Sequence, residues 1–172
     1  MKKLKVYLEM TMFNYYFDED RDAHADTVTL FEECAAGKFE PYTSDYVLAE
    51  LEAAPEPKRE HMLNLIGKYD VNVLSFSEET NVLAEKYIAE GALPEGSLTD
   101  ARHIAMATVG DLDIIVSLNF RHIVKEKTRE MTGAINKIRG YNIVKILSPM
   151  EVLDSENTRY NIGRNSRNPS RN

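Results

Sequence analysis

Cysteine and long apolar runs are the features that this 172-residue sequence has least of. Its one cysteine, Cys34, cannot form an internal disulfide, and a free thiol is typical of a reducing compartment. No apolar run approaches the roughly 20 residues that a membrane-spanning helix needs. The first residues lead into a strand with alternating polar positions, without the apolar stretch of a signal peptide. We therefore expect a cytoplasmic protein without a membrane anchor.

Basic residues are also outnumbered, 21 against 28 acidic ones, which gives a net charge of −7. Two stretches reverse that sign: residues 121–145, with seven Lys or Arg against two Glu, and residues 155–172, with four Arg against one Glu. A basic strip on an acidic protein can bind nucleic acid locally. A solvated helix face and a flexible chain end explain the same charges equally well.

The composition, 43% hydrophobic and 28% charged, is that of an ordinary globular protein. At this length we expect one domain over residues 1–154, large enough to bury a core. Residues 155–172 are rich in Arg, Asn, Ser and Gly, so we expect them to form a flexible basic tail.

Short apolar runs alternate with amphipathic stretches, which is typical of an α/β fold with a mostly parallel sheet of about five strands. The predicted strands are 5–8, 39–43, 71–76, 114–118 and 142–147. The predicted helices are 26–36, 44–54, 58–69, 77–91, 99–110, 127–139 and a short one after Ser148, with Ser44 and Thr99 as N-caps.

Several familiar ligand-binding motifs are absent. Residues 91–98 imitate the glycine spacing of a phosphate-binding loop, but they follow a helix and have Ser97-Leu98 where Lys-Ser/Thr is required. The acidic run 18–22 lacks the glycine and the final glutamate of a calcium loop. The four histidines show no zinc-ligand spacing.

Acid or amide residues stand where predicted strands end or helices begin. Glu9 and Asn119 each follow a strand, and Asp100 lies in the first turn of a helix. Glu50 and Glu52 both border the apolar face of their helix, and the helical wheel does not choose between them. The carboxyl ends of parallel strands meet at one edge, where ligands bind. A pocket of carboxylates without a basic partner is unfavourable unless it holds divalent metal, so metal-dependent chemistry on phosphate esters is predicted.

Five segments of the chain resemble the PIN-domain nucleases, and most closely the VapC-like toxins of type II toxin–antitoxin pairs. They are VYLEMTMF (6–13), YTSDYVLAELEAA (42–54), SLTDARHIAMAT (97–108), LDIIVSLNFRHI (112–123) and GYNIVKILSPMEVL (140–153). The resemblance implies a three-layer α/β/α sandwich whose clustered acids bind Mg²⁺ or Mn²⁺ and hydrolyse RNA.

Matched position by position, the acids of the family fall on Glu9, Glu50 and Asp100, and the hydroxyl residue near the first acid falls on Thr11. The fourth acidic position falls on Asn119. Two residues depart from the pattern. Glu9 is one methylene longer than the usual aspartate, and Asn119 offers a neutral oxygen in place of a carboxylate. The resemblance therefore implies one firm metal site and a weaker second one.

The mechanism implied by the resemblance divides the site residues into three groups. The three carboxylates hold the metal ion, whose bound water attacks the phosphodiester in line, while Asn119 and Thr11 position metal-bound waters. Arg121, His122 and Lys125 contact RNA phosphates, although a structural role for His122 is an equal alternative. His103 is expected to be a packing residue.

The resemblance also implies a cognate antitoxin that covers the pocket, and homodimers are common in the family. Two other functions stay open for the same residues. One is a catalytically weak PIN-like module that binds RNA or a protein. The departures from the family pattern at Glu9 and Asn119 suggest it. The other is a nuclease that acts on DNA.

Overall fold

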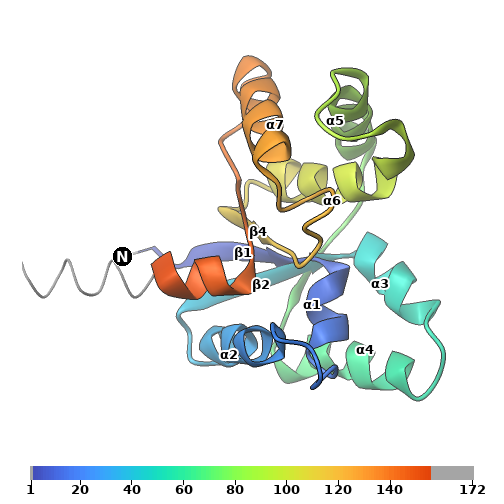
Figure 1. Cartoon of the computed structure of the whole chain (residues 1–172), viewed down its shortest axis with the longest axis vertical. Coiled ribbons are helices and arrows are strands. Elements are labelled where there is room, and N and C mark those ends of the chain that lie inside the picture. The colour runs from blue at the N-terminus through green and yellow to red at the C-terminus, as the bar shows by residue number, and fades with distance from the viewer. Residues whose placement is uncertain (1, 156–172) are drawn as a thin grey trace, which may run out of the picture.

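The computed structural model describes residues 2–155, which form a five-stranded sheet between two groups of helices (Figure 1). The strand order is β3-β2-β1-β4-β5, and every neighbouring pair is parallel. The strands are β1 (Leu4–Leu8), β2 (Phe39–Ser44), β3 (Asn72–Leu74), β4 (Ile114–Val116) and β5 (Lys145–Leu147). The predicted α/β class and the parallel five-stranded sheet are confirmed.

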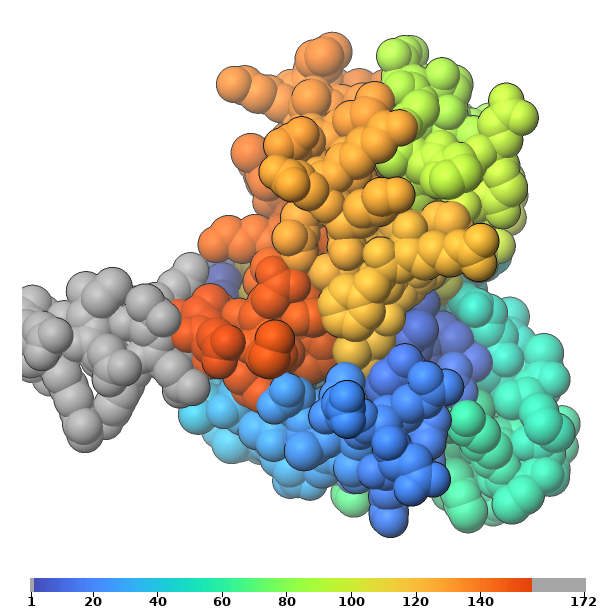
Figure 2. Space-filling view, in the orientation of Figure 1, coloured from blue at the N-terminus to red at the C-terminus, as the bar shows by residue number. Residues whose placement is uncertain are grey.

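The helices lie in two layers, so the sandwich implied by the resemblance is also confirmed. They are α1 (Met10–Tyr15), α2 (His24–Ala35), α3 (Asp45–Glu52), α4 (Lys58–Lys68), α5 (Glu78–Ala89), α6 (Leu98–Val109) and α7 (Glu126–Ile138). In Figure 1, α1, α2 and α4 lie below the sheet, and α5, α6 and α7 lie above it. Figure 2 shows the orange surface of α7 against the green surface of α5 at the top of the molecule.

The centre of the sheet is apolar because both of its faces are covered. Val6, Tyr7 and Leu8 of β1 are fully buried, and every residue of β4 is buried. Parallel strands with two covered faces require continuous apolar runs, which explains why these two strands were the clearest in the sequence. The carboxyl ends of all five strands meet along one edge, and the site residues lie there.

Local sequence explains how two of the helices begin. The hydroxyl of Ser44 accepts a hydrogen bond from the backbone N–H of Val47 at 3.1 Å, so the predicted N-cap of α3 is confirmed. Ser148 and Glu151 cap each other's backbone N–H groups at the start of the final helix, which runs from residue 149 to at least 155.

The observed elements differ from the predicted ones in three respects. Helix α1 was not predicted, because its N-cap is Glu9, an uncommon capping residue, and its six residues have no clear apolar period. Thr99 does not cap α6; a 3₁₀ turn at Glu95–Ser97 leads directly into the helix, and Ser97 is the N-cap. Strands β3, β4 and β5 are also shorter than predicted.

The structure also bears on three predictions outside the site: the burial of Cys34, the membrane-spanning potential of the helices and the C-terminal tail. Cys34 is buried as a small apolar residue, and burial raises the pKa of its thiol to about 12. Among residues 2–155, no helix is long and apolar enough to cross a membrane. The predicted flexible tail, apart from Ser155, lies outside the described residues.

Candidate active site

Glu9 is a buried carboxylate held in place by three hydrogen bonds. Its Oε2 accepts from the backbone N–H of Thr11 at 3.0 Å, from the Thr11 hydroxyl at 2.5 Å and from the Ser117 hydroxyl at 2.9 Å. The side chain is only 4% exposed. Hydrogen bonds to an ionised oxygen are the stronger class, so Glu9 is rigidly placed at the end of β1.

Thr11 and Ser117 join the end of β1 to the end of β4. The Thr11 hydroxyl also accepts the backbone N–H of Leu118 at 2.8 Å, and the Ser117 hydroxyl accepts the backbone N–H of Asn119 at 3.0 Å. Each hydroxyl therefore donates a hydrogen bond to Glu9 and accepts one from a backbone N–H in the segment that follows β4. Thr11 acts on Glu9 directly, which gives it a definite place in the site.

Glu50 lies against a buried histidine that sequence reasoning had treated as a packing residue. Its Oε1 is 2.7 Å from Nε2 of His103, at an angle outside ordinary hydrogen-bond geometry, and neither atom has another partner among residues 2–155. Nδ1 of His103 is 2.8 Å from the Tyr7 hydroxyl, which is 2.8 Å from Oγ of Ser44. A buried polar chain therefore runs from Ser44 through Tyr7 and His103 to Glu50.

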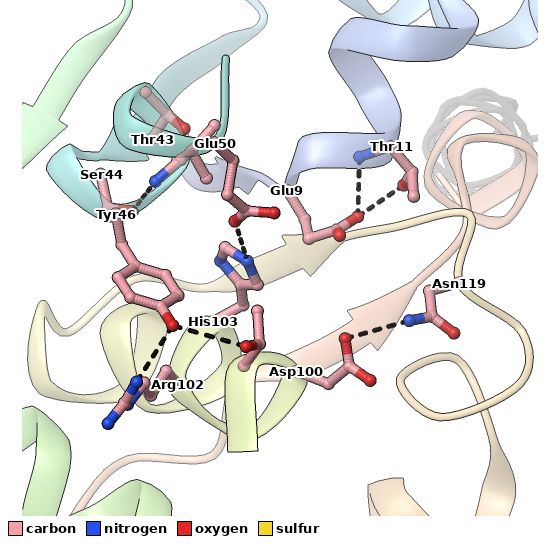
Figure 3. Close-up of polar contacts among 12 residues, drawn as sticks. Glu9, Thr11, Thr43, Ser44, Tyr46, Glu50, Asp100, Arg102, His103 and Asn119 are labelled. Carbon is pink, nitrogen blue, oxygen red and sulfur yellow. Dashed lines mark hydrogen bonds and ion pairs between the residues drawn. The ribbon is translucent and has the colours of Figure 1, made fainter. Parts of the chain in front are cut away.

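All three carboxylates surround His103. Burial alone lowers the pKa of His103, but the contact with Glu50 and the negative charges of Glu9, Glu50 and Asp100 together outweigh burial and raise it. Figure 3 shows the carboxylate of Glu50 turned toward the imidazole, whereas those of Glu9 and Asp100 contact Thr11 and Asn119. Glu9 lies between β1 and α1, Glu50 lies in α3 and Asp100 lies in α6, so the fold brings together residues that are far apart in sequence.

Burial disfavours the negative charge of Asp100. Its side chain is half-buried in the first turn of α6, and burial is the largest influence on its pKa and raises it, whereas His103 and His122 lower it. The carboxylate of Glu50 raises it further, whereas a hydrogen bond from Asn119 lowers it. A cation placed among these acids would relieve that cost.

Asn119 presents its amide nitrogen, not its oxygen, to the acidic cluster. Nδ2 donates to Oδ1 of Asp100 at 3.2 Å, while Oδ1 accepts the backbone N–H of His122 at 3.0 Å (Figure 3). Because a backbone N–H can only donate, the amide orientation is determined. In this arrangement Asn119 holds Asp100 in position and shapes the following loop, and its oxygen is not directed at the acids.

The donor set suits a hard divalent cation, which prefers carboxylate oxygens. The raised pKa of Asp100 and the Glu50 oxygen without a well-aligned partner both agree with such an ion. Among the described residues, however, no three His, Cys, Asp or Glu side chains are already arranged as a metal-binding group. Glu50 would have to turn from His103 toward Glu9 and Asp100 to complete it.

The three predicted RNA-binding residues follow Asn119 on the loop and lie together. Arg121 and Lys125 are exposed, His122 is half-buried, and all three line one cavity beside the acidic cluster. His122 is also tied into the loop: its backbone N–H donates to Asn119, and its carbonyl accepts the Thr128 hydroxyl at 2.8 Å. Its backbone therefore has a structural role, and the residue also lines the cavity.

Comparison with known proteins identifies the fold. No family model and no curated protein matches the sequence. Solved structures do match it. VapBC2 from Rickettsia felis, bound to a DNA fragment from its promoter, has a TM-score of 0.53 at 14% identity, covering 84% of this chain and 98% of that one. DNA-bound VapBC from Salmonella typhimurium has a TM-score of 0.51 at 13% identity, covering 85% and 98%. The chain has a PIN-like fold.

VapC20 from Mycobacterium tuberculosis, a sarcin-ricin loop cleaving toxin, matches with a TM-score of 0.48 at 15% identity, covering 64% of this chain and 86% of that one. The two VapBC structures, with TM-scores above 0.5, confirm the resemblance seen in the sequence as a resemblance of fold. The fold alone does not identify the activity of this PIN-like chain, which depends on its own site residues.

Sequence reasoning missed four residues that support the acids of the PIN-like fold. His103, Tyr7 and Ser44 form the buried series of polar contacts that begins at Glu50, and Ser117 donates a hydrogen bond to Glu9. Ser117 had a usable signal, because a small polar residue in the buried segment Ile114–Leu118 needs a partner. Tyr7 and His103 had none: Tyr7 stands between two apolar residues, and the position of His103 on its helix indicated only packing.

Proposed function

We propose that the protein is a Mg²⁺- or Mn²⁺-dependent endoribonuclease that hydrolyses RNA phosphodiesters, and that it is the toxin of a toxin–antitoxin pair. The observation that carries the proposal is the gathering of Glu9, Glu50 and Asp100 around His103 at the carboxyl edge of a PIN-like sheet. Among residues 2–155, no Lys or Arg forms an ion pair with these carboxylates, whose basic neighbour is His103. Carboxylate oxygens are the donors expected for a divalent cation.

The three acids would hold the cation, which when bound supplies a Lewis acid for the phosphoryl oxygen and lowers the pKa of an attacking water. The chain itself supplies positioning. Thr11 and Ser117 hold Glu9, and Asn119 holds Asp100. Arg121, His122 and Lys125 would bind RNA phosphates, which places the strand without reading its sequence.

The toxin assignment rests on the solved relatives, which are structures of VapBC bound to DNA. By analogy we expect a cognate antitoxin that covers the acidic cluster, with an Arg or Lys inserted among the carboxylates. A short reading frame beside this one would supply the candidate, and co-purification of the two products would test it. A homodimer is a further expectation from the resemblance.

Cleavage of single-stranded RNA by charge-neutral variants tests the proposed function. Asp100→Asn and Glu9→Gln should each abolish Mn²⁺-dependent cleavage, and Glu50→Gln should do the same. Glu52→Gln is the matched control, because Glu52 lies on the same helix as Glu50 but is exposed. Circular dichroism establishes that each variant is folded. Full activity in both Asp100→Asn and Glu9→Gln would contradict the mechanism.

One observation favours a second candidate, a PIN-like module that binds RNA or protein without cutting. Glu50 is turned onto His103, and Asn119 directs an N–H group at Asp100, so the cluster is not arranged as a metal site before the ion binds. RNA binding without cleavage at any Mn²⁺ concentration would select this candidate. Side-by-side assays on single-stranded RNA and DNA decide between ribonuclease and deoxyribonuclease.

A further inference from the structure

A basic cavity adjoins the acidic cluster on the side of the loop after β4. Its volume is about 490 Å³, within the range of small-molecule sites. The walls come from the end of α5, the segment 91–95, the loop after β4 and the first turn of α7. In Figure 2 the gold and orange surface around residues 118–128 is exposed on the side of the molecule drawn there. Residues 91–95, part of the segment 91–98 that was rejected as a phosphate-binding loop, contribute one wall.

The cavity has unpaired positive charge at its rim. Arg121, Lys125 and Lys127 are exposed, and their side chains make no ion pair or hydrogen bond within the part of the chain that the structure describes. No side chain caps the N-terminus of α7, where Lys125 occupies the N-cap position. Glu95 is the one carboxylate in the lining. The balance of charge favours an anion.

The inner wall is apolar. The half-buried Ile88 of α5 supplies its accessible surface, and Ala92 and Leu93, which are only 2% and 3% exposed, lie behind it in the lining. Such a wall offers a surface for a sugar or a base, whereas inorganic phosphate alone would leave it without a partner. The lining therefore combines the two requirements of a nucleotide, an apolar surface and a basic rim.

Asn119 connects this cavity to the acidic cluster. Its backbone carbonyl accepts the N–H groups of Ile123 and Val124, its Oδ1 accepts that of His122, and its Nδ2 donates to Asp100. The loop that carries the cavity's His122 is therefore built on the residue that holds Asp100. The two hydrogen bonds of the Asn119 side chain therefore join the loop that lines the cavity to the acidic cluster.

We propose that this cavity is a nucleotide subsite that takes one unstacked nucleotide of a single strand next to the phosphodiester to be cut, with Lys125 and Lys127 on its phosphate. A nucleotide inside a duplex keeps its base stacked and paired, so the subsite selects single-stranded substrate. The proposal deepens the proposed ribonuclease function and rests on it for the identity of the strand. Because RNA binding is measured without metal, the nucleotide subsite and the proposed ribonuclease activity can fail separately.

Fluorescence anisotropy of a labelled ten-nucleotide single-stranded RNA in EDTA tests the subsite. The variant is Lys125→Ala with Lys127→Ala, and the matched control is Lys137→Ala with Arg139→Ala, which removes two exposed cations from the other end of α7. Two lost phosphate contacts reduce the slope of log K against log salt by about 1.4, so affinity should fall about 25-fold at 0.1 M salt. The control should bind nearly as wild type does.

Competition identifies the ligand. AMP should displace the labelled RNA at a lower concentration than inorganic phosphate, and a ten-residue polyglutamate should displace it less well than unlabelled RNA. Glu95→Gln should bind more tightly. Equal loss in both double variants, equal competition by AMP and phosphate, or stronger competition by polyglutamate would each overturn the subsite. If RNA binds as predicted but Mn²⁺ never produces cleavage, the subsite stands and the proposed ribonuclease fails.

Discussion

Replacing Tyr7 with Phe tests whether the buried chain behind Glu50 positions that carboxylate. Tyr7 is fully buried, and its hydroxyl bridges Ser44 and His103 at 2.8 Å each. The change keeps the ring and removes only the hydroxyl. Ser44 keeps its hydrogen bond from Val47, but Nδ1 of His103 loses its partner among the described residues. One buried group left unsatisfied costs about 1–3 kcal/mol of the free energy of unfolding.

Tyr87→Phe is the matched control. Tyr87 is equally buried, and its hydroxyl contacts Thr108 and Asn136 on the upper helices, away from the acids. Urea unfolding should therefore show a similar loss for both variants, with unchanged dependence on denaturant. Only Tyr7→Phe should also slow Mn²⁺-dependent RNA cleavage, by roughly tenfold to a hundredfold, because catalytic groups misplaced by about 1 Å lose that much. Equal cleavage rates in the two variants would refute the positioning role of Tyr7 and His103.

Three further predictions concern single residues. Asn119→Asp should lower the melting temperature of the metal-free protein, because it replaces a hydrogen bond to Asp100 with a second negative charge. For the same reason, added Mn²⁺ should raise the melting temperature of this variant more than that of the wild-type protein. Identical melting curves for the two proteins would count against this. Cys34 should not react with Ellman's reagent at pH 8 until urea unfolds the protein, since burial raises its pKa to about 12; rapid labelling of the folded protein would contradict its burial. Gly133→Ala should stabilise the exposed part of α7 by about 0.5–1 kcal/mol, whereas Gly110→Ala should destabilise, because its new Cβ would lie 2.8 Å from Leu74 Cδ1; urea unfolding of both variants decides.

The central strands and most helices could be predicted from local sequence because burial and capping leave local signals. The apolar residues of β1 and β4 reflect a sheet covered on both faces, and Ser44 has the side chain that α3 needs at its N-cap. Helix α1 left no such signal, because its cap is the glutamate that also belongs to the site.

The edge of the sheet at which the predicted residues lie followed from the sequence, but the contacts among their side chains did not. Sequence position indicated that Glu9, Asp100 and Asn119 reach one edge of the sheet. It could not indicate that the Asn119 oxygen is taken by His122, or that Glu50 pairs with His103, because both contacts depend on side-chain orientation after folding. His103 was predicted to be a packing residue; it is buried, and it also lies at the centre of the carboxylates.

Calorimetric titration of Mn²⁺ into the metal-free protein tests most directly whether the three carboxylates form a metal site. The wild-type protein should bind one ion with a dissociation constant in the micromolar to millimolar range, and its melting temperature should rise by mass action. Asp100→Asn should lose that binding, while Glu52→Gln should retain it. Absence of binding heat in the wild-type protein, or unchanged binding in Asp100→Asn, would contradict the account.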